Sequence, residues 1–282
     1  MTTSEFQWTT PDGLSIYAIN YPCPTPKAVV VLVHGLGEHC HRYEHVAAYF
    51  NARHFALLAY DRRGHGRSGG KRGHAPDVNA LLDEIGHLVS EAQTRYPNIP
   101  VFLYGHSMGG NLVLTYILKR HPDLAGVVST APWIQLAFQP PVILVAIAKL
   151  MRRIFPGFVQ RNNLVSDHLS RDKAVVEAYE KDPLVHDFIS VSAATGMLET
   201  AAWLNAYADH FPLPLLLMHG GADQITSPKA SEAFAKRAQG DITWHLWEGF
   251  YHEIHNEPEK AEVLGKVTGW MDSRLKTASP TQ

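Results

Sequence analysis

Short apolar runs recur along most of the chain and alternate with longer segments of mixed polarity. Runs of this kind are typical of strands covered on both faces, as in a parallel sheet, because neither face meets water. The expected strands are residues 28–33, 56–60, 101–104, 126–129 and 213–218, followed by a last strand at 242–246.

The segments between these runs have the period of helices. From Val78 to Val89, apolar residues recur at spacings of three and four, which places one apolar stripe against a sheet. Alternating residues at 6–9 and 14–21 flank the turn signal Pro11-Asp12-Gly13 and predict an antiparallel hairpin before the first parallel strand. The alternation of strands and helices predicts an α/β fold with a mostly parallel central sheet flanked by helices.

This alternation is interrupted once. It stops after Pro132 and resumes near Pro212, and the residues between are rich in Leu, Ile, Val, Phe and Trp without the pattern of sheet strands. We interpret them as an inserted helical cap. The predicted organisation is therefore a core formed by residues 1–131 and 212–282, with the cap at 132–211.

Composition and charge exclude several classes of function. Hydrophobic residues make up 45% of the chain and charged residues 18%, a balance typical of globular proteins. A formal net charge of −2 without a block of like charges gives no electrostatic reason to expect nucleic acid as a partner. Cys23 and Cys40 are too few for a disulfide framework, and we expect both to be reduced.

The apolar segments also bear on location. The first residues are polar and lack the apolar stretch of a secretory signal, so a cytoplasmic location is expected. The uncharged segment Trp133–Ala148 falls short of the ~20 residues that span a bilayer, and Pro140-Pro141 interrupts it. We expect this segment to reach lipid only as a peripheral contact.

A candidate nucleophile follows the strand at 101–104. Gly105, Ser107 and Gly109 form a G-x-S-x-G pattern, and the apolar run at 112–118 predicts a helix after it. A serine on a sharp turn between strand and helix is the nucleophile arrangement of α/β-hydrolases, where small residues on either side make room for the turn. The pattern also occurs in ordinary glycine-rich turns, but its position between strand and helix favours Ser107 as a nucleophile.

A serine hydroxyl needs a base, and the base needs an orienting acid. In this fold the acid and then the histidine follow the serine along the chain. Asp223 comes shortly after the strand at 213–218 and is the favoured acid. Asp209 and Asp241 are rivals, but neither follows a buried strand in this way.

Two histidines compete for the role of base. His252 lies in the loop after the last expected strand, and His255 lies where a final helix would begin. A loop at the carboxyl end of a strand faces the nucleophile, so His252 is favoured.

Attack on an ester produces an oxyanion that requires backbone N–H donors. One is expected from Met108, the residue after the nucleophile, and the other from Leu36 in the loop His34–Gly37, which follows an early strand. We expect His39 and Arg42 to brace this loop by hydrogen bonds. The histidines at 34, 39, 41 and 45 lack the spacing of a metal site, and the glycine spacing in the turn-rich loop Asp61–Ser68 is too weak to indicate phosphate binding. No metal or other cofactor is expected.

Three segments together resemble a known family. His34–Tyr43, Asp61–Ser68 and Gly105–Gly110 are similar to the monoacylglycerol lipase and lysophospholipase branch of the α/β-hydrolases. The resemblance covers nearly the whole core and is weakest in the cap. It implies Leu36 and Met108 as oxyanion donors, His252 as base, and a mobile hydrophobic cap over an acyl tunnel that helps the enzyme to dock on lipid surfaces.

These observations predict a serine hydrolase that cleaves lipid esters, with monoacylglycerol as the favoured substrate. A lysophospholipase, a general carboxylesterase and a non-catalytic binding protein on the same fold are the alternatives. The sequence leaves the oligomeric state of the protein open. The acyl pocket is expected to be lined by cap residues, although such residues also serve simply to pack a cap onto a core. The candidate lining residues are Phe138, Ile143, Ile147 and Leu150.

Overall fold

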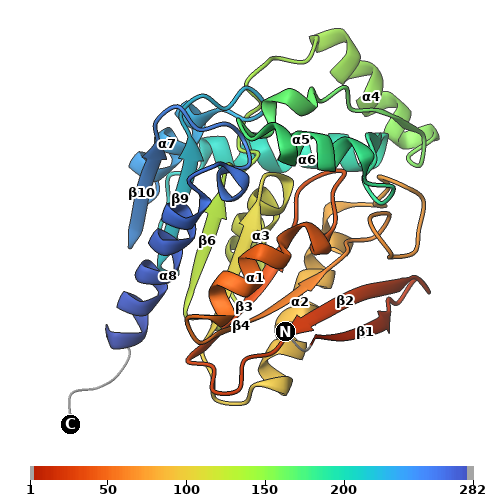
Figure 1. Cartoon of the computed structure of the whole chain (residues 1–282). Coiled ribbons are helices and arrows are strands. Elements are labelled where there is room, and N and C mark those ends of the chain that lie inside the picture. The colour runs from red at the N-terminus through yellow and green to blue at the C-terminus, as the bar shows by residue number, and fades with distance from the viewer. Residues whose placement is uncertain (1–2, 278–282) are drawn as a thin grey trace.

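A computed structural model describes residues 3–277. Its centre is an eight-stranded sheet in the order β1-β2-β4-β3-β5-β6-β9-β10, in which the pairs β1–β2 and β2–β4 are antiparallel and all other pairs are parallel (Figure 1). The strands are β1 (Ser4–Thr9), β2 (Ser15–Tyr21), β3 (Ala28–Val33), β4 (Phe55–Tyr60), β5 (Val101–His106), β6 (Gly126–Thr130), β9 (Leu215–Gly220) and β10 (Ile242–Trp247). This arrangement confirms the predicted mostly parallel sheet.

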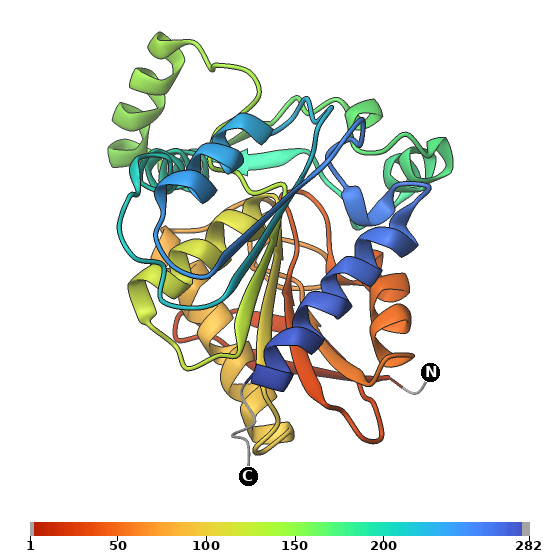
Figure 2. The same cartoon turned by 90° about the vertical axis from the view of Figure 1, so that its left-hand side faces the viewer.

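Helices cover both faces of the sheet, as Figure 2 shows. On one face α1 (Glu44–Asn51) lies beside α8 (Lys260–Thr277), and on the other α2 (Val78–Arg95) and α3 (Met108–Arg120) are joined by α7 (Pro228–Arg237). Successive residues of β3 alternate between the two faces: Val29, Val31 and Val33 belong to one hydrophobic cluster, and Ala28, Val30 and Leu32 to the other. Because both faces are covered, the fully buried strands β3, β4, β5, β6 and β9 consist mostly of apolar residues.

The chain between β6 and β9 lies above the carboxyl edge of the sheet (Figure 1). It contains α4 (Val142–Ile154), α5 (Lys173–Lys181) and α6 (Val191–Ala206), and also a small antiparallel sheet of β7 (Val159–Arg161) and β8 (Phe188–Ser190), which sequence analysis did not anticipate.

The parts of this segment differ in how closely they join the core. Met197, Ala201 and Leu204 of α6 belong to the same hydrophobic cluster as α3, whereas α4 has no buried residue. The predicted limits of the cap, 132 and 211, stay a prediction. Residues 1, 2 and 278–282 of the predicted core lie outside the described residues.

The expected elements agree with the structure apart from small shifts at their ends. The largest shift concerns β9, which begins at Leu215 and ends at Gly220. Pro212 and Pro214 have no N–H to donate to a neighbouring strand, so regular pairing begins after them. None of the helices within residues 3–277 is long and apolar enough to cross a membrane.

Candidate active site

Three loops meet at the carboxyl edge of the sheet, where the parallel strands β5, β9 and β10 end. Ser107 follows β5, Asp223 follows β9, and His252 lies in the loop after β10. In open α/β sheets this edge is where ligands bind, because loops from several strands converge there. The structure thus brings together three residues that are distant in sequence.

The turn at Ser107 is strained. Ser107 has φ 57° and ψ −117°, a left-handed conformation that non-glycine residues seldom adopt. The turn is also crowded: a Cβ on Gly105 would lie 2.4 Å from the Gly109 carbonyl oxygen, and a Cβ on Gly109 would lie 2.1 Å from the Val33 carbonyl oxygen. Only glycine fits these two positions, which explains the spacing of the motif.

A chain of hydrogen bonds joins the three side chains. The Ser107 hydroxyl lies 2.9 Å from Nε2 of His252, and Nδ1 of His252 lies 2.7 Å from Oδ2 of Asp223. A carboxylate only accepts, so Nδ1 carries the proton and Nε2 is free to accept the serine proton. The geometry is that of a hydroxyl beside a general base whose tautomer is fixed by an acid.

Asp223 is buried yet remains ionised. Its Oδ1 accepts the backbone N–H groups of Ile225 and Thr226, and its Oδ2 also accepts from Nε2 of His219. Burial opposes ionisation, but the contacts with His252 and His219 outweigh it and hold the pKa of Asp223 well below its ordinary value. The carboxylate is thereby available to orient His252.

His252 and His255 have opposite electrostatic environments although they are three residues apart. Burial lowers the pKa of His252, but the attraction of Asp223 outweighs burial and raises this pKa above its ordinary value. Burial lowers the pKa of His255 to about 3. His255 stacks on Tyr43, and neither of its ring nitrogens has a hydrogen-bond partner within the described part of the chain. His255 therefore packs as a neutral ring.

The rival acids lie elsewhere. Asp241 directly precedes β10, at the amino edge of the sheet, and pairs with Arg274. Asp209 lies in the connection from α6 to β9, which also approaches the sheet at that edge. Neither carboxylate is among the hydrogen-bond partners of His252.

The loop after β3 lies directly against the nucleophile turn. A Cβ on Gly35 would lie 3.2 Å from the Cβ of Ser107, so the loop approaches Ser107 as closely as a glycine permits. Leu36 lines the same cavity as Ser107, and Met108 begins α3 immediately after it. The two residues predicted to supply the oxyanion donors are thus both neighbours of Ser107.

Buried ion pairs connect this loop to the loop that carries His252. Arg42 bonds to Glu38 at 2.7 Å and to both carboxylate oxygens of Glu253 at 2.7 and 2.8 Å. Glu38 also accepts the backbone N–H of Gly35. The expected bracing by Arg42 is therefore present in the structure, whereas His39 reaches Asp182 in the segment above the sheet.

A cavity of about 290 Å³ opens above Ser107. Its wall is mostly apolar and includes Leu36, Trp133, Leu136, Phe138, Leu144, Val145, Ala148, Ile189, Leu198 and Ile225. Its polar wall includes Gln160, Arg161, Asn162, Asn163, Thr195 and Thr226. None of the described residues that line it is acidic.

The placement of the predicted lining residues requires a correction. Phe138 lines the cavity, but Ile143, Ile147 and Leu150 do not, and these three are 73%, 52% and 60% exposed. Helix α4 is apolar on more than one side, and it turns Leu144, Val145 and Ala148 to the cavity instead. Residues spaced three and four apart lie on one face of a helix. The face formed by Ile143, Ile147 and Leu150 points to solvent.

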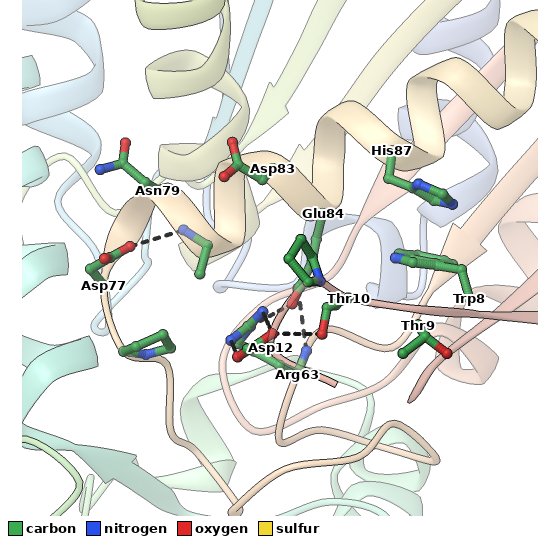
Figure 3. A pocket seen from close by; sticks show the side chains of 13 residues that line it. Trp8, Thr9, Thr10, Asp12, Arg63, Asp77, Asn79, Asp83, Glu84 and His87 are labelled. Atoms are coloured by element: carbon green, nitrogen blue, oxygen red, sulfur yellow. Dashed lines mark hydrogen bonds and ion pairs between the residues drawn. The ribbon is translucent and has the colours of Figure 1, made fainter. Parts of the chain in front are cut away.

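A second cavity, of about 440 Å³, lies between the β1–β2 turn and α2, away from Ser107 (Figure 3). Asp12, Arg63 and Glu84 form an ion-paired group in its wall, and the ring of Trp8 stacks on that of His87. These side chains already pair with one another and include no nucleophile. Within residues 3–277 no group of three or more His, Cys, Asp or Glu side chains is arranged to hold a metal ion.

Sequence analysis missed several residues that surround the three candidate side chains. Glu38 and Glu253 carry no signal of their own, because their pairing with Arg42 depends on how two distant loops fold. His219 and Thr226 flank Asp223 in sequence and contact its carboxylate. Only their closeness in sequence to the candidate acid could have indicated a role for them.

Comparison with known proteins gives consistent matches. The family model described as serine aminopeptidase, S33 matches residues 24–259. An uncharacterized abhydrolase domain-containing protein of Dictyostelium discoideum is 40% identical over 262 residues, which cover 91% of this chain but only 27% of that protein. The monoacylglycerol lipase of Mycolicibacterium smegmatis is 36% identical over 277 residues, which cover 97% of this chain and 99% of the lipase.

The fold is similar to that of a solved lipase. The crystal structure of Paleococcus ferrophilus monoacylglycerol lipase has a TM-score of 0.85 and 35% sequence identity, and it covers 92% of this chain and 99% of its own. Sequence and structure therefore agree over nearly the full length of the chain.

Proposed function

Because this chain belongs to the serine aminopeptidase S33 family of α/β-hydrolases, we propose that it hydrolyses monoacylglycerols to fatty acid and glycerol. The family description names a peptidase, while a relative that is covered to 99% of its length is a lipase, so the choice of substrate depends on the site. The observation that carries the proposal is the hydrogen-bonded series Ser107, His252 and Asp223 opening into a mostly apolar cavity.

In the proposed acylation, Nε2 of His252 accepts the Ser107 proton while Oγ attacks the ester carbonyl carbon. The carbonyl oxygen becomes an oxyanion that accepts the backbone N–H groups of Leu36 and Met108. The bond to the glycerol oxygen then breaks, and His252 donates the proton to this leaving oxygen. Ser107 is left as an ester of the fatty acid.

Deacylation reverses the roles. Water enters the site vacated by glycerol, gives a proton to His252 and attacks the acyl carbon. A second oxyanion forms between the same donors, Ser107 leaves and recovers its proton from His252, and the fatty acid is released. Asp223 remains ionised throughout and stabilises the imidazolium that forms in each half-reaction.

The cavity supports a single acyl chain with a small neutral headgroup. Each methylene buried against its apolar wall contributes about 0.8 kcal/mol, which favours long chains over short ones. The amides of Asn162 and Asn163 offer partners for glycerol hydroxyls. No acidic residue is present in the described wall to pair with a choline cation, so lysophosphatidylcholine would bury a charge without a partner.

Helix α4 supports a peripheral contact with lipid. Ile143, Ile147, Leu150 and Ile154 form an exposed apolar row, and Lys149 and Arg153 are exposed beside it. An amphipathic helix of this kind binds at the surface of a bilayer rather than across it. We assign the segment 132–211 as the cap through which substrate passes from lipid to Ser107.

The test is a panel of esters below their micellar concentrations: a long-chain monoacylglycerol, lysophosphatidylcholine with the same acyl chain, and p-nitrophenyl butyrate. The monoacylglycerol should have the highest kcat/KM, and Ser107→Ala should abolish turnover of all three. A higher kcat/KM for lysophosphatidylcholine or for the butyrate would move the assignment to a lysophospholipase or a general esterase.

A further inference from the structure

Arg62 is a fully buried arginine that has no carboxylate partner among the described residues. Its side chain is 0% exposed, and within residues 3–277 its guanidinium hydrogen bonds go to the Gly35 carbonyl oxygen and to Sδ of Met108 at 3.5 Å. Its Nε has no partner among the described residues. A buried cation without a counterion is costly, so its position calls for a specific explanation.

The two groups that Arg62 contacts belong to the two sides of the proposed oxyanion site. Met108 supplies one of the proposed N–H donors, and the Gly35 carbonyl belongs to the same peptide unit as the other donor, the N–H of Leu36. In a trans peptide the carbonyl and the N–H point in opposite directions. Because Arg62 binds the Gly35 carbonyl oxygen, the N–H of Leu36 points away from Arg62.

His34 reinforces the same orientation. The backbone N–H of Arg62 donates to Nε2 of His34 at 3.0 Å, so the proton of this imidazole resides on Nδ1. Nδ1 lies 2.8 Å from the Gly35 carbonyl oxygen and donates to it. Burial, followed by the charge of Arg62, lowers the pKa of His34 well below its ordinary value, so the ring stays neutral in this arrangement.

We propose that Arg62 is a positioning residue that orients and polarises the Gly35–Leu36 peptide, so that the Leu36 N–H stabilises the oxyanion. The proposal rests on the proposed function, because it takes Leu36 as an oxyanion donor. A cation bonded to the carbonyl of an amide draws electron density from it and makes its N–H a stronger donor. The positive charge of the fully buried Arg62 adds a favourable field where negative charge develops.

The neighbouring residue provides a matched control. Arg63 is also buried in the same loop, but its guanidinium pairs with Glu84 at 2.5 Å and with Asp12 at 2.8 Å, in the wall of the second cavity (Figure 3). It contacts neither Gly35 nor Met108. Substitution of Arg63 should affect stability and leave the chemistry unchanged.

The experiment compares Arg62→Met, Arg62→Lys and Arg63→Lys with the wild type. Turnover of p-nitrophenyl octanoate reports the reaction without depending on the lipid headgroup, and inhibition by octylboronic acid, which forms a tetrahedral adduct with a serine, reports oxyanion binding. Thermal unfolding and the fraction labelled by a fluorophosphonate report folding. If Arg62→Met does not fold, Arg62→Gln takes its place.

We expect Arg62→Met to lower kcat by about 10- to 100-fold, less than the loss of a whole oxyanion donor, with KM nearly unchanged. The Ki of the boronate should rise by the same factor. Arg62→Lys should fall between Arg62→Met and the wild type, because an ammonium retains the charge and can donate hydrogen bonds but lacks the planar fork. Arg63→Lys should change the midpoint of unfolding but neither kcat nor Ki.

Three outcomes would overturn the proposal: a loss of activity that only follows the folded fraction, a lower kcat with an unchanged boronate Ki, or a lysine variant as impaired as the methionine variant. Failure of the proposed function is distinguishable, because it would show in the wild type as slow hydrolysis of monoacylglycerol. The Arg62 series would remain readable with the p-nitrophenyl ester.

Discussion

The carboxyl edge of the sheet, which carries the candidate active site, and helix α4 place their side chains in opposite environments. At the edge, polar groups are buried: Asp223 is 7% exposed and His252 is 3% exposed. Each of the proposed catalytic side chains there has a hydrogen-bond partner. In α4, apolar groups are exposed, with Val142 at 83% and Ile143 at 73%. The three side chains at the edge bond to one another, whereas the apolar surface of α4 is exposed to solvent.

Under the proposed function, the two regions would serve two different tasks, bond cleavage and capture of the lipid. Bond cleavage needs fixed geometry, which buried hydrogen bonds provide at low cost only when every group is paired. Capture of a lipid needs accessible apolar surface, which a closed core cannot provide. Substitutions at the edge should therefore change kcat, and substitutions on the outer side of α4 should change encounter with lipid.

The largest effect is expected from the two histidines of one loop. His252→Gln should lower kcat by about 10⁴- to 10⁶-fold, because the base is lost while the binding groups remain. His255→Phe should retain activity within about 3-fold, because a ring of similar shape keeps the stacking on Tyr43. Steady-state kinetics on p-nitrophenyl octanoate measure both. The reverse ranking would mean that His255 is the base.

The next effect concerns the acid. Asp223→Asn should lower kcat by about 10⁴-fold, because an amide can donate to Nδ1 and hold His252 in the wrong tautomer. Asp241→Asn, at the opposite edge of the sheet, should leave kcat within about 2-fold, since it loses only a partly exposed ion pair with Arg274. Equal losses in both variants would show that the effect arises from folding and not from the site.

A smaller effect, confined to lipid surfaces, is expected from α4. Replacing both Ile143 and Leu150 by serine should weaken binding to phosphatidylcholine vesicles by at least about 10-fold, because two exposed apolar side chains can no longer insert. Vesicle co-sedimentation measures the binding. Turnover of a monomeric ester should be unchanged.

A matched variant on the other side of α4 sharpens this prediction. Val145→Ser, at the cavity wall, should leave vesicle binding intact and raise KM for long-chain esters. If both variants affect the same quantity, the two sides of α4 do not have separate roles.

The smallest expected effect is a shift in pH dependence. His252 must be neutral to accept the Ser107 proton, and its pKa is raised because Asp223 outweighs burial. The kcat/KM should therefore rise with pH through a midpoint above the ordinary histidine value of about 6.5, and activity should be lost below that midpoint. In Asp223→Asn the midpoint should move to lower pH. A midpoint that does not move would separate Asp223 from the titration of the base.

The fold and the three candidate residues were accessible from sequence for a physical reason. Buried parallel strands are continuous apolar runs, and the loops after their carboxyl ends meet at one edge, so strand positions alone indicate that Ser107, Asp223 and His252 converge. Glycines at 105 and 109 add a steric requirement that few other turns share.

The remaining features depend on contacts that no local pattern encodes. The pairing of Arg42 with Glu253 joins residues 211 positions apart, and Arg62 lies in a segment whose sequence indicates only a turn. Helix α4 is apolar on several sides, so its period could not identify the side that faces the cavity, and three of the predicted lining residues were misplaced.

The most direct test of the account is to trap the acyl-enzyme. The protein is mixed with a long-chain monoacylglycerol, quenched with acid within one turnover, digested and examined by mass spectrometry. The peptide that carries Ser107 should gain the mass of the fatty acyl group, and no acylated peptide should be found in Ser107→Ala. Rapid release of fatty acid without acylation of Ser107, or acylation of another residue, would contradict it.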